Sequence, residues 1–466
     1  MQKIDASVVL SPTDLANHLA CKHVSWLNYR AMMGGPRPSK EEDELSEILR
    51  QYGTEHEAAY FEALKTHLNT INRTIVNLDS DRDQSAPYTV AALEERAKLT
   101  ADKLADGPDA VYQPTFFSQE NGIGWVGRAD FLVATDTPSQ LGNYSFEPED
   151  TKLARIAKVN AVLQLCSYAE HLTNMQGVEP EFIHVVTGSA KEGKVSIRLS
   201  EVSAYFRHVK EVLQNEVLNQ FAGHSEPVPV ENCTMCRWNK DCTRWWREHD
   251  HLSFVAGLQN GHREALNAHG IFTLKGFATS ADSLTVPDIE DEALHRLRRQ
   301  AQLQYTTRVN RELDADALPE TEFLLPLKDF RGFNLLPTPN PGDLFYDIEG
   351  HPYRTDEGLE YLHGFSWQEE DGSFQYKEIW AHTAEQERQA LIEVLDFINE
   401  RRAMPGFEDM RVYHFGHYEP SALRRLATRY ATRETELNAL LRERVFCDLS
   451  RVVTQSMRVG VESYSI

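Results

Sequence analysis

Residues 127–155, GRADFLVATDTPSQLGNYSFEPEDTKLAR, carry the strongest pattern in the first half of the chain, a predicted β-hairpin. Residues 123–133 and the segment YSFEPEDTKLA have strand-like patterns, and ATDTPSQLGN between them is typical of a hairpin loop. Pro148 suggests an edge strand or a bulge in the second strand. An amphipathic helix, two more strands and another helix follow, so the order predicts a mixed α/β core that closes near residue 222.

Acidic and basic side chains in this stretch predict a site that cleaves phosphodiesters. Asp150 and Lys152 are two residues apart, so on a strand they project from the same face, and the hairpin can bring Asp130 alongside. Carboxylates suit Mg²⁺ or Mn²⁺, which neutralises a phosphate and lowers the pKa of the attacking water. A lysine can offset the charge that develops during the reaction.

Three further residues follow the same order along the chain. His56 lies in the helical stretch GTEHEAAYFEALKTHL, and Gln164 and Tyr168 are four residues apart on the helix that follows Lys152. Each part of the pattern is weak evidence alone. A single histidine is usually packed or exposed, a D-x-K triplet is usually solvated surface, and Gln164 and Tyr168 alone would be helix surface. The combined order from His56 to Tyr168 is what favours a nuclease.

Four of the six cysteines predict a metal centre. Cys233, Cys236 and Cys242 form a C-x2-C-x5-C cluster, and Cys21 lies about two hundred residues upstream. In a reducing compartment such thiols are more often metal ligands than disulfides. Their spacing suits tetrahedral zinc and an iron–sulfur cluster almost equally. The cations and aromatic residues around the cluster (237–247) favour packing slightly over contact with a single strand.

Composition sets the frame for these sites. The 466 residues predict two or three domains, and no apolar run or leader points to a membrane or to secretion, so we expect a cytoplasmic protein. The net charge of −23 argues against a broadly basic nucleic-acid binder, although a local basic strip beside an acidic metal site is compatible with it.

Six motifs in residues 9–245 resemble the RecB-like branch of the PD-(D/E)XK nucleases, in particular its iron–sulfur subgroup, which includes the AddB nuclease domain and the CRISPR-adaptation nucleases. They are SPTDLANHLACKH, GTEHEAA, GRADFL, DTKLAR, QLCSY and CTMC-x5-C. The resemblance implies a restriction-endonuclease-like core with metal on His56, Asp130 and Asp150, a catalytic Lys152, and Gln164 and Tyr168 as the Q-x3-Y pair. It also implies a [4Fe–4S] cluster on Cys21, Cys233, Cys236 and Cys242. Glu147 and Glu149 neighbour Asp150, but only Asp150 has the (D/E)-x-K spacing.

A second acidic site is expected after the boundary signal TPNPGD. Asp347 and Glu349 occupy i and i+2 of the apolar strand LFYDIEG, where buried acids are costly unless they bind something. The stretch from residue 341 resembles the RNase H-like fold of DEDD exonucleases, which implies that Glu419 and Asp448 join the site. The last acidic motif of that family is absent before the end at ESYSI, so this domain is expected to be incomplete, and inactivity is favoured over activity.

The expected domains are therefore a nuclease with an iron–sulfur clasp at 1–250, a mostly helical linker at 251–338 and an RNase H-like domain at 339–466. The order resembles a RecB-like family in which some members continue into a helicase, which implies a helicase domain or subunit as partner. The principal hypothesis is a Mg²⁺- or Mn²⁺-dependent DNA exonuclease acting on single strands or duplex ends. The alternatives are a non-catalytic nucleic-acid-binding scaffold with a structural metal and an RNase that uses Asp347 and Glu349.

Overall fold

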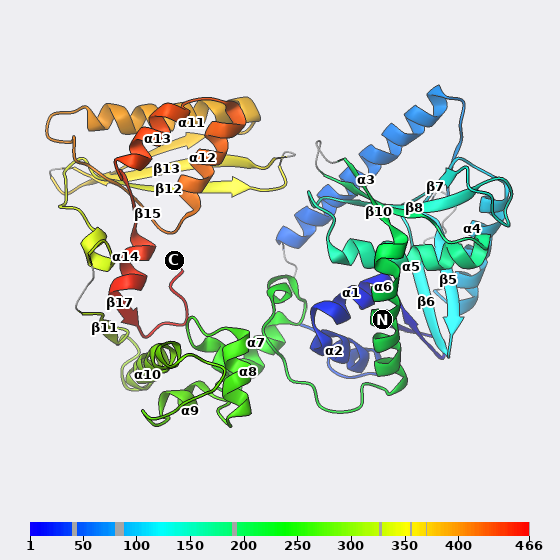
Figure 1. Cartoon of the computed structure of the whole chain (residues 1–466), viewed down its shortest axis with the longest axis horizontal. Helices are drawn as coiled ribbons and strands as arrows, with labels where there is room; N and C mark the ends of the chain where they lie inside the picture. Colours follow the sequence, from blue (N-terminus) through cyan, green and yellow to red (C-terminus); the bar gives the residue numbers. More distant parts are fainter. Residues whose placement is uncertain are drawn as a thin grey trace. The chain divides into compact units, whose positions relative to one another are not determined.

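The computed structural model describes residues 1–39, 44–79, 88–188, 193–325, 329–354, 357–369 and 371–465. The chain divides into two compact α/β units, Met1–Trp245 and Trp246–Ile466 (Figure 1). None of the helices within the described ranges is long and apolar enough to cross a membrane.

Two sheets build the first unit. In the larger sheet, strands far apart in sequence lie side by side, and its order is β10 (Lys194–Arg198), β9 (Phe182–Thr187), β8 (Ser145–Lys152), β7 (Phe131–Thr135), β4 (Ala110–Tyr112) and β3 (Ile75–Asn77). The smaller sheet has the order β1 (Gln2–Ile4), β2 (Ser7–Leu10), β6 (Ile123–Arg128) and β5 (Thr115–Glu120).

The expected hairpin is present as β7 and β8, which pair antiparallel with Phe131 opposite Glu149. The single strand expected over residues 123–133 is two strands, β6 and β7, that belong to different sheets. The expectation of an edge strand or bulge at Pro148 is also wrong, because β8 lies between β7 and β9. The ladder to β9 begins at Glu149, directly after Pro148, so this ladder does not need the missing N–H.

The helices of the first unit follow their local signals. Ser11 and Asp14 form a capping box at the start of α1 (Pro12–Ala20), and Cys21 separates α1 from α2 (Lys22–Met32). The apolar face of α5 (Val159–Gln176) enters a core built around large buried rings such as Phe116 and Trp125. The remaining helices are α3 (Glu44–Thr70), α4 (Val90–Ala105), α6 (Leu199–Leu218), η1 (Glu231–Met235) and α7 (Asn239–Glu248), and the boundary between the units lies within α7.

The second unit has one five-stranded sheet, ordered β14 (Phe374–Trp380), β13 (Leu359–Gln368), β12 (Leu344–His351), β15 (Val412–His414) and β16 (Phe446–Asp448). β12, β15 and β16 run parallel, while β13 and β14 complete an antiparallel meander. Their buried face packs against α11 (Ala384–Arg402), α12 (Tyr418–Tyr430) and α13 (Glu434–Arg442), which gather on one side of the sheet in Figure 1.

The segment before this sheet is mostly helical and has a core of its own, which includes Leu266, Phe277 and Leu297. Its elements are η2 (Leu252–Phe254), α8 (Asn260–Ala268), α9 (Leu274–Ala278), α10 (Asp291–Leu313), β11 (Thr321–Phe323) and η3 (Gly332–Leu335). After the sheet, α14 (Leu449–Ser456) leads into β17 (Met457–Val459), which pairs with β11 and so joins the end of the chain to the helical segment.

Candidate active site

The structure brings Asp130, Asp150 and Lys152 together at the ends of β7 and β8. Asp150 and Lys152 form an ion pair, as their i, i+2 spacing on one strand predicts. Asp130 lies just before β7, and its Oδ2 accepts hydrogen bonds from the backbone N–H of Thr151 at 2.7 Å and from the Thr151 hydroxyl at 2.8 Å. These bonds fix one carboxylate beside the other.

Asp150 is completely buried, and its surroundings disfavour its charged form. Burial, followed by the nearby charge of Asp130, raises the pKa of Asp150 to about 8, although Lys152 acts in the opposite direction. Two carboxylates this close repel each other in a region of low dielectric. A cation between them would relieve that repulsion, which makes the pair a candidate ligand set.

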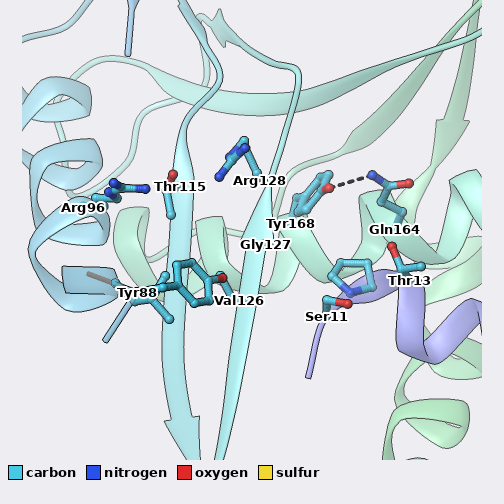
Figure 2. Close-up of a pocket in the computed structure, with 12 residues that line it drawn as sticks. Ser11, Thr13, Tyr88, Arg96, Thr115, Val126, Gly127, Arg128, Gln164 and Tyr168 are labelled. Carbon is cyan, nitrogen blue, oxygen red and sulfur yellow. Dashed lines mark hydrogen bonds between the residues drawn. The ribbon is translucent and has the colours of Figure 1, made fainter. Parts of the chain in front are cut away.

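Gln164 and Tyr168 from α5 extend the site. The side-chain amide of Gln164 lies 3.4 Å from Asp150 Oδ1 and donates a 2.7 Å hydrogen bond to the Tyr168 hydroxyl (Figure 2). Tyr168 is buried, and a Cβ at Gly127 would stand only 2.9 Å from its ring. Gly127 therefore lets β6 approach the tyrosine closely, so the Q-x3-Y spacing and the glycine of GRADFL belong to one arrangement.

The two glutamates that neighbour Asp150 point away from it. Glu149 accepts a 2.6 Å hydrogen bond from the Tyr60 hydroxyl and forms an ion pair with Lys194. Glu147 accepts a 2.9 Å bond from the backbone N–H of Phe182, and it lies 2.8 Å from His184 Nε2. Because side chains alternate along β8, these two carboxylates occupy the opposite face of the strand.

Helix α3 contributes Glu57 as well as His56. The Glu57 carboxylate accepts hydrogen bonds from the Tyr112 hydroxyl at 2.8 Å and from Gln113 at 2.5 Å. Burial, followed by the charge of Asp130, raises its pKa. Glu57 was not predicted from the sequence as a site residue, although it directly follows His56 in GTEHEAA. Within the described residues, His56 forms no hydrogen bond or ion pair with the aspartates, and its buried Nε2 has no hydrogen-bond partner.

The donors fit a magnesium-like ion bound by few protein ligands. Within the part of the chain that the structure describes, no three His, Cys, Asp or Glu side chains are arranged to hold one metal ion. Mg²⁺ commonly keeps several waters and binds proteins through one or two carboxylates together with substrate phosphates. The Asp130 and Asp150 pair meets that smaller requirement.

A cavity of about 270 Å³ opens beside Gln164 and Tyr168 (Figure 2). Arg96 from α4, Arg128 from β6 and Thr115 from β5 line it, and the start of α1 closes another part of its wall. Guanidinium and hydroxyl groups suit phosphate oxygens. The cavity is therefore a polar surface along which a phosphate group could reach Gln164 and Tyr168.

The four candidate cysteines line one small cavity of about 20 Å³, and the clasp expected from them stays a prediction. The chain supplies them from the α1–α2 junction, η1, the residue after η1, and α7. Burial, followed by the charges of the neighbouring thiols Cys236, Cys21 and Cys233, raises the pKa of Cys242 to about 12. The shared cavity and the mutual effect of the thiols on their pKa values show that the four cysteines are neighbours. Within the described residues, however, no three of them are arranged to hold one metal ion. As it stands, the space suits one atom the size of a water or metal ion.

Residues around the cysteines join the two ends of the unit by packing and hydrogen bonds. The Oδ1 atom of Asn28 in α2 accepts a bond from Arg237 at 2.7 Å and from the buried Trp238 indole at 2.8 Å. His23 of α2 lies 2.9 Å from the Ser225 hydroxyl. For Arg237 and Trp238 these contacts favour the packing interpretation. Cys166 and Cys447 are buried core residues, as expected.

The second acidic site differs from its expectation. Asp347 and Glu349 are exposed, while Leu344, Tyr346 and Ile348 alternate with them and are buried. The expectation that these acids are buried is therefore wrong, because the strand is covered on one face only. A solvated carboxylate costs little, so burial no longer argues for a bound ion there.

Glu419 and Asp448 have other partners. Glu419 is buried in α12 with its Oε2 3.2 Å from His414 Nδ1, and its charge acts on Tyr346, which belongs to the covered face of β12. The Oδ1 of Asp448 accepts backbone bonds from Gly416, Ser450 and Arg451 at the start of α14. The expectation that Glu419 and Asp448 join Asp347 and Glu349 in one site stays a prediction.

Residues 344–466 match the family model of the RNase_H superfamily. The expected RNase H-like character of the C-terminal domain is thereby confirmed, and it indicates a nuclease-type activity on nucleic acid. The match does not reach the first unit, whose PD-(D/E)XK resemblance stays a prediction. No curated protein matches the chain.

Proposed function

We propose that the first unit is a metal-dependent nuclease that hydrolyses phosphodiester bonds in DNA, acting on single strands or duplex ends. The observation that supports this most is the convergence of Asp130, Asp150 and Lys152 at the end of one hairpin. The RNase H-like second unit is consistent with a protein that works on nucleic acid.

The two aspartates and Lys152 would have different roles in the reaction. A bound Mg²⁺ or Mn²⁺ would supply charge neutralisation at the phosphate and a water of lowered pKa. Asp130, oriented by Thr151, and Asp150, oriented by Gln164, are the carboxylates that would hold it. The Lys152 side chain is about one-third exposed, so its ammonium can reach a substrate oxygen and offset developing negative charge.

Arg96 and Arg128 would bind the phosphates of the DNA strand and so position it. They line the cavity beside Gln164 and Tyr168, where guanidinium groups can pair with consecutive phosphates. This local basic strip accounts for how a chain of net charge −23 could hold a polyanion next to its carboxylates.

Cleavage of a labelled single-stranded oligodeoxynucleotide tests the proposal. Wild-type protein should degrade it with Mg²⁺ or Mn²⁺ and not with EDTA, whereas Asp150→Asn should reduce the rate at least ~100-fold. The matched control is Asp136→Asn, which alters an exposed carboxylate in the hairpin loop and should retain the wild-type rate. Full activity of Asp150→Asn with an unchanged metal requirement would refute the assignment.

We further infer that the four clustered cysteines hold a structural metal centre. The family resemblance favours a [4Fe–4S] cluster, while four thiolates suit a single tetrahedral zinc ion equally well in chemical terms. An absorption spectrum of anaerobically purified protein, with iron and zinc quantified, separates the two. About four irons and a broad band near ~400 nm would identify the cluster, and about one zinc would identify the ion.

The second candidate function is RNA cleavage by the RNase H-like unit, favoured by the family match and by two acids on an uncovered strand face. Comparing Asp347→Ala with Asp150→Ala on RNA and DNA distinguishes the sites. Loss of RNA cleavage in Asp347→Ala alone would assign that activity to the second unit. Binding without cleavage of either substrate would favour the scaffold alternative.

A further inference from the structure

The second unit contains a cavity of about 680 Å³ with a basic lining. It lies where β15 and β16 end, beside the starts of α12 and α14 and next to η3. Its cationic lining residues are Arg411, Arg424, Arg444 and Arg451, and His414 and His417 lie beside them.

Positive charge in this cavity is poorly balanced by the protein. Asp448 is the only acidic residue in its described lining, and its Oδ1 is occupied by three backbone N–H groups. Within the described residues, none of the four arginines forms an ion pair with a carboxylate, although ion pairs are frequent elsewhere in this acidic chain. Such a concentration of guanidinium groups without a carboxylate partner among the described residues is the electrostatic feature expected of a phosphate site.

An aromatic side chain at the rim adds a second kind of contact. Phe330 is 70% exposed and has a φ of 58°, a left-handed conformation that is unusual for a bulky residue. The Arg444 guanidinium lies 5.4 Å from its ring centre, and Arg444 also has a positive φ. An exposed ring beside cations is the combination on which single-stranded nucleic acids stack.

We propose that this cavity binds the phosphate backbone of a single nucleic-acid strand, with Phe330 as a platform for one base. The site differs from the carboxylate site of the first unit and from the exposed Asp347 and Glu349, so it requires no cleavage by either. The RNase H-like unit would therefore bind a nucleic-acid strand whether or not it also cleaves one.

Fluorescence anisotropy with a labelled single strand of about 20 nucleotides tests this binding site on the full chain. The measurement is made in EDTA, which removes the metal that cleavage requires. Arg424→Gln combined with Arg451→Gln should weaken binding ~10-fold or more and lower the slope of log affinity against log salt by about 1 to 1.5. Arg296→Gln combined with Arg442→Gln removes two exposed charges outside the cavity and should leave both quantities near wild type.

Phe330→Ala should weaken binding ~10-fold while leaving the salt slope unchanged, because stacking releases no counterions. Wild-type affinity and slope in the cavity double variant would overturn the proposal, as would an equal loss in the control pair. Displacement of the strand by stoichiometric AMP would assign the cavity to a free nucleotide instead. Because binding is measured in EDTA, where no cleavage is needed, a failure of the nuclease proposal remains distinguishable from a failure of this one.

Discussion

Asp150 is a buried carboxylate held between opposite influences, the ammonium of Lys152 and the carboxylate of Asp130. The D-x-K spacing was sufficient to predict that Asp150 and Lys152 share a face, because the period of a strand is two. It could not predict burial, which depends on the strands and helices around β8. Burial is what raises the pKa of Asp150 and favours a cation beside it.

His171 should make the first unit less stable in acid. Its ring is buried and stacked 5.4 Å from Phe116, and burial, followed by the charge of Lys210, lowers its pKa to about 4. Between pH 6.5 and 4 the unfolded chain binds a proton at His171 that the folded chain does not. The stability contributed by the neutral ring is therefore complete above pH 6.5 and falls as the pH drops toward 4.

His171→Phe keeps an aromatic ring but removes this titration. Compared with wild type, the variant should lose less free energy of unfolding between pH 7 and pH 4.5, by on the order of 2 kcal/mol. Urea titrations monitored at both pH values measure the difference. His67→Phe, at an exposed position of α3, is the control and should follow wild type, and identical pH dependence in all three proteins would contradict the burial argument.

At the scale of elements, the β7–β8 hairpin and α5 could be predicted because their patterns are local. Glu57 could not, because its place beside Asp130 depends on how α3 packs on β4, where Phe61 lies 4.5 Å from the Tyr112 ring. In β12 the alternation was present in the letters LFYDIE, and it correctly indicates one exposed face. The error came from treating the strand as apolar throughout.

The position of Glu57 predicts a role in metal affinity. Its pKa is raised by burial and by Asp130, so its charge and that of Asp130 are coupled. Glu57→Gln should raise the Mg²⁺ concentration needed for half-maximal cleavage by ~10-fold, as is typical for residues that support metal ligands. Glu55→Gln, on the exposed face of α3, should leave it unchanged. An unaltered Mg²⁺ dependence in Glu57→Gln would remove this residue from the site.

At the scale of the whole molecule, the cysteines connect the beginning and the end of the first unit. Cys21 lies between the first two helices, whereas Cys233, Cys236 and Cys242 close the unit, so a metal among them would restrict a loop of about two hundred residues. The spacing and the resemblance predict such a centre, and it stays a prediction. The spacing cannot distinguish zinc from a cluster, because four thiolates suit both.

Cys242→Ser should therefore lower the metal content of the purified protein to near zero and lower the thermal midpoint of unfolding by several degrees. Metal analysis and differential scanning calorimetry measure the two effects. Cys166→Ala changes a core cysteine outside the cavity and should keep its metal. Full metal content in Cys242→Ser would contradict the proposed centre.

The central claim is that the face of β8 carrying Asp150 and Lys152 performs catalysis while the opposite face is structural. Each face holds one lysine–carboxylate ion pair, Lys152 with Asp150 and Lys194 with Glu149, so the chain supplies its own matched comparison. The decisive measurement is the rate of single-stranded DNA cleavage, with Mg²⁺, by Lys152→Ala and Lys194→Ala. We expect Lys152→Ala to lose at least ~100-fold in rate and Lys194→Ala to stay within a few-fold of wild type. Equal rates in the two variants, or loss in Lys194→Ala alone, would contradict the account.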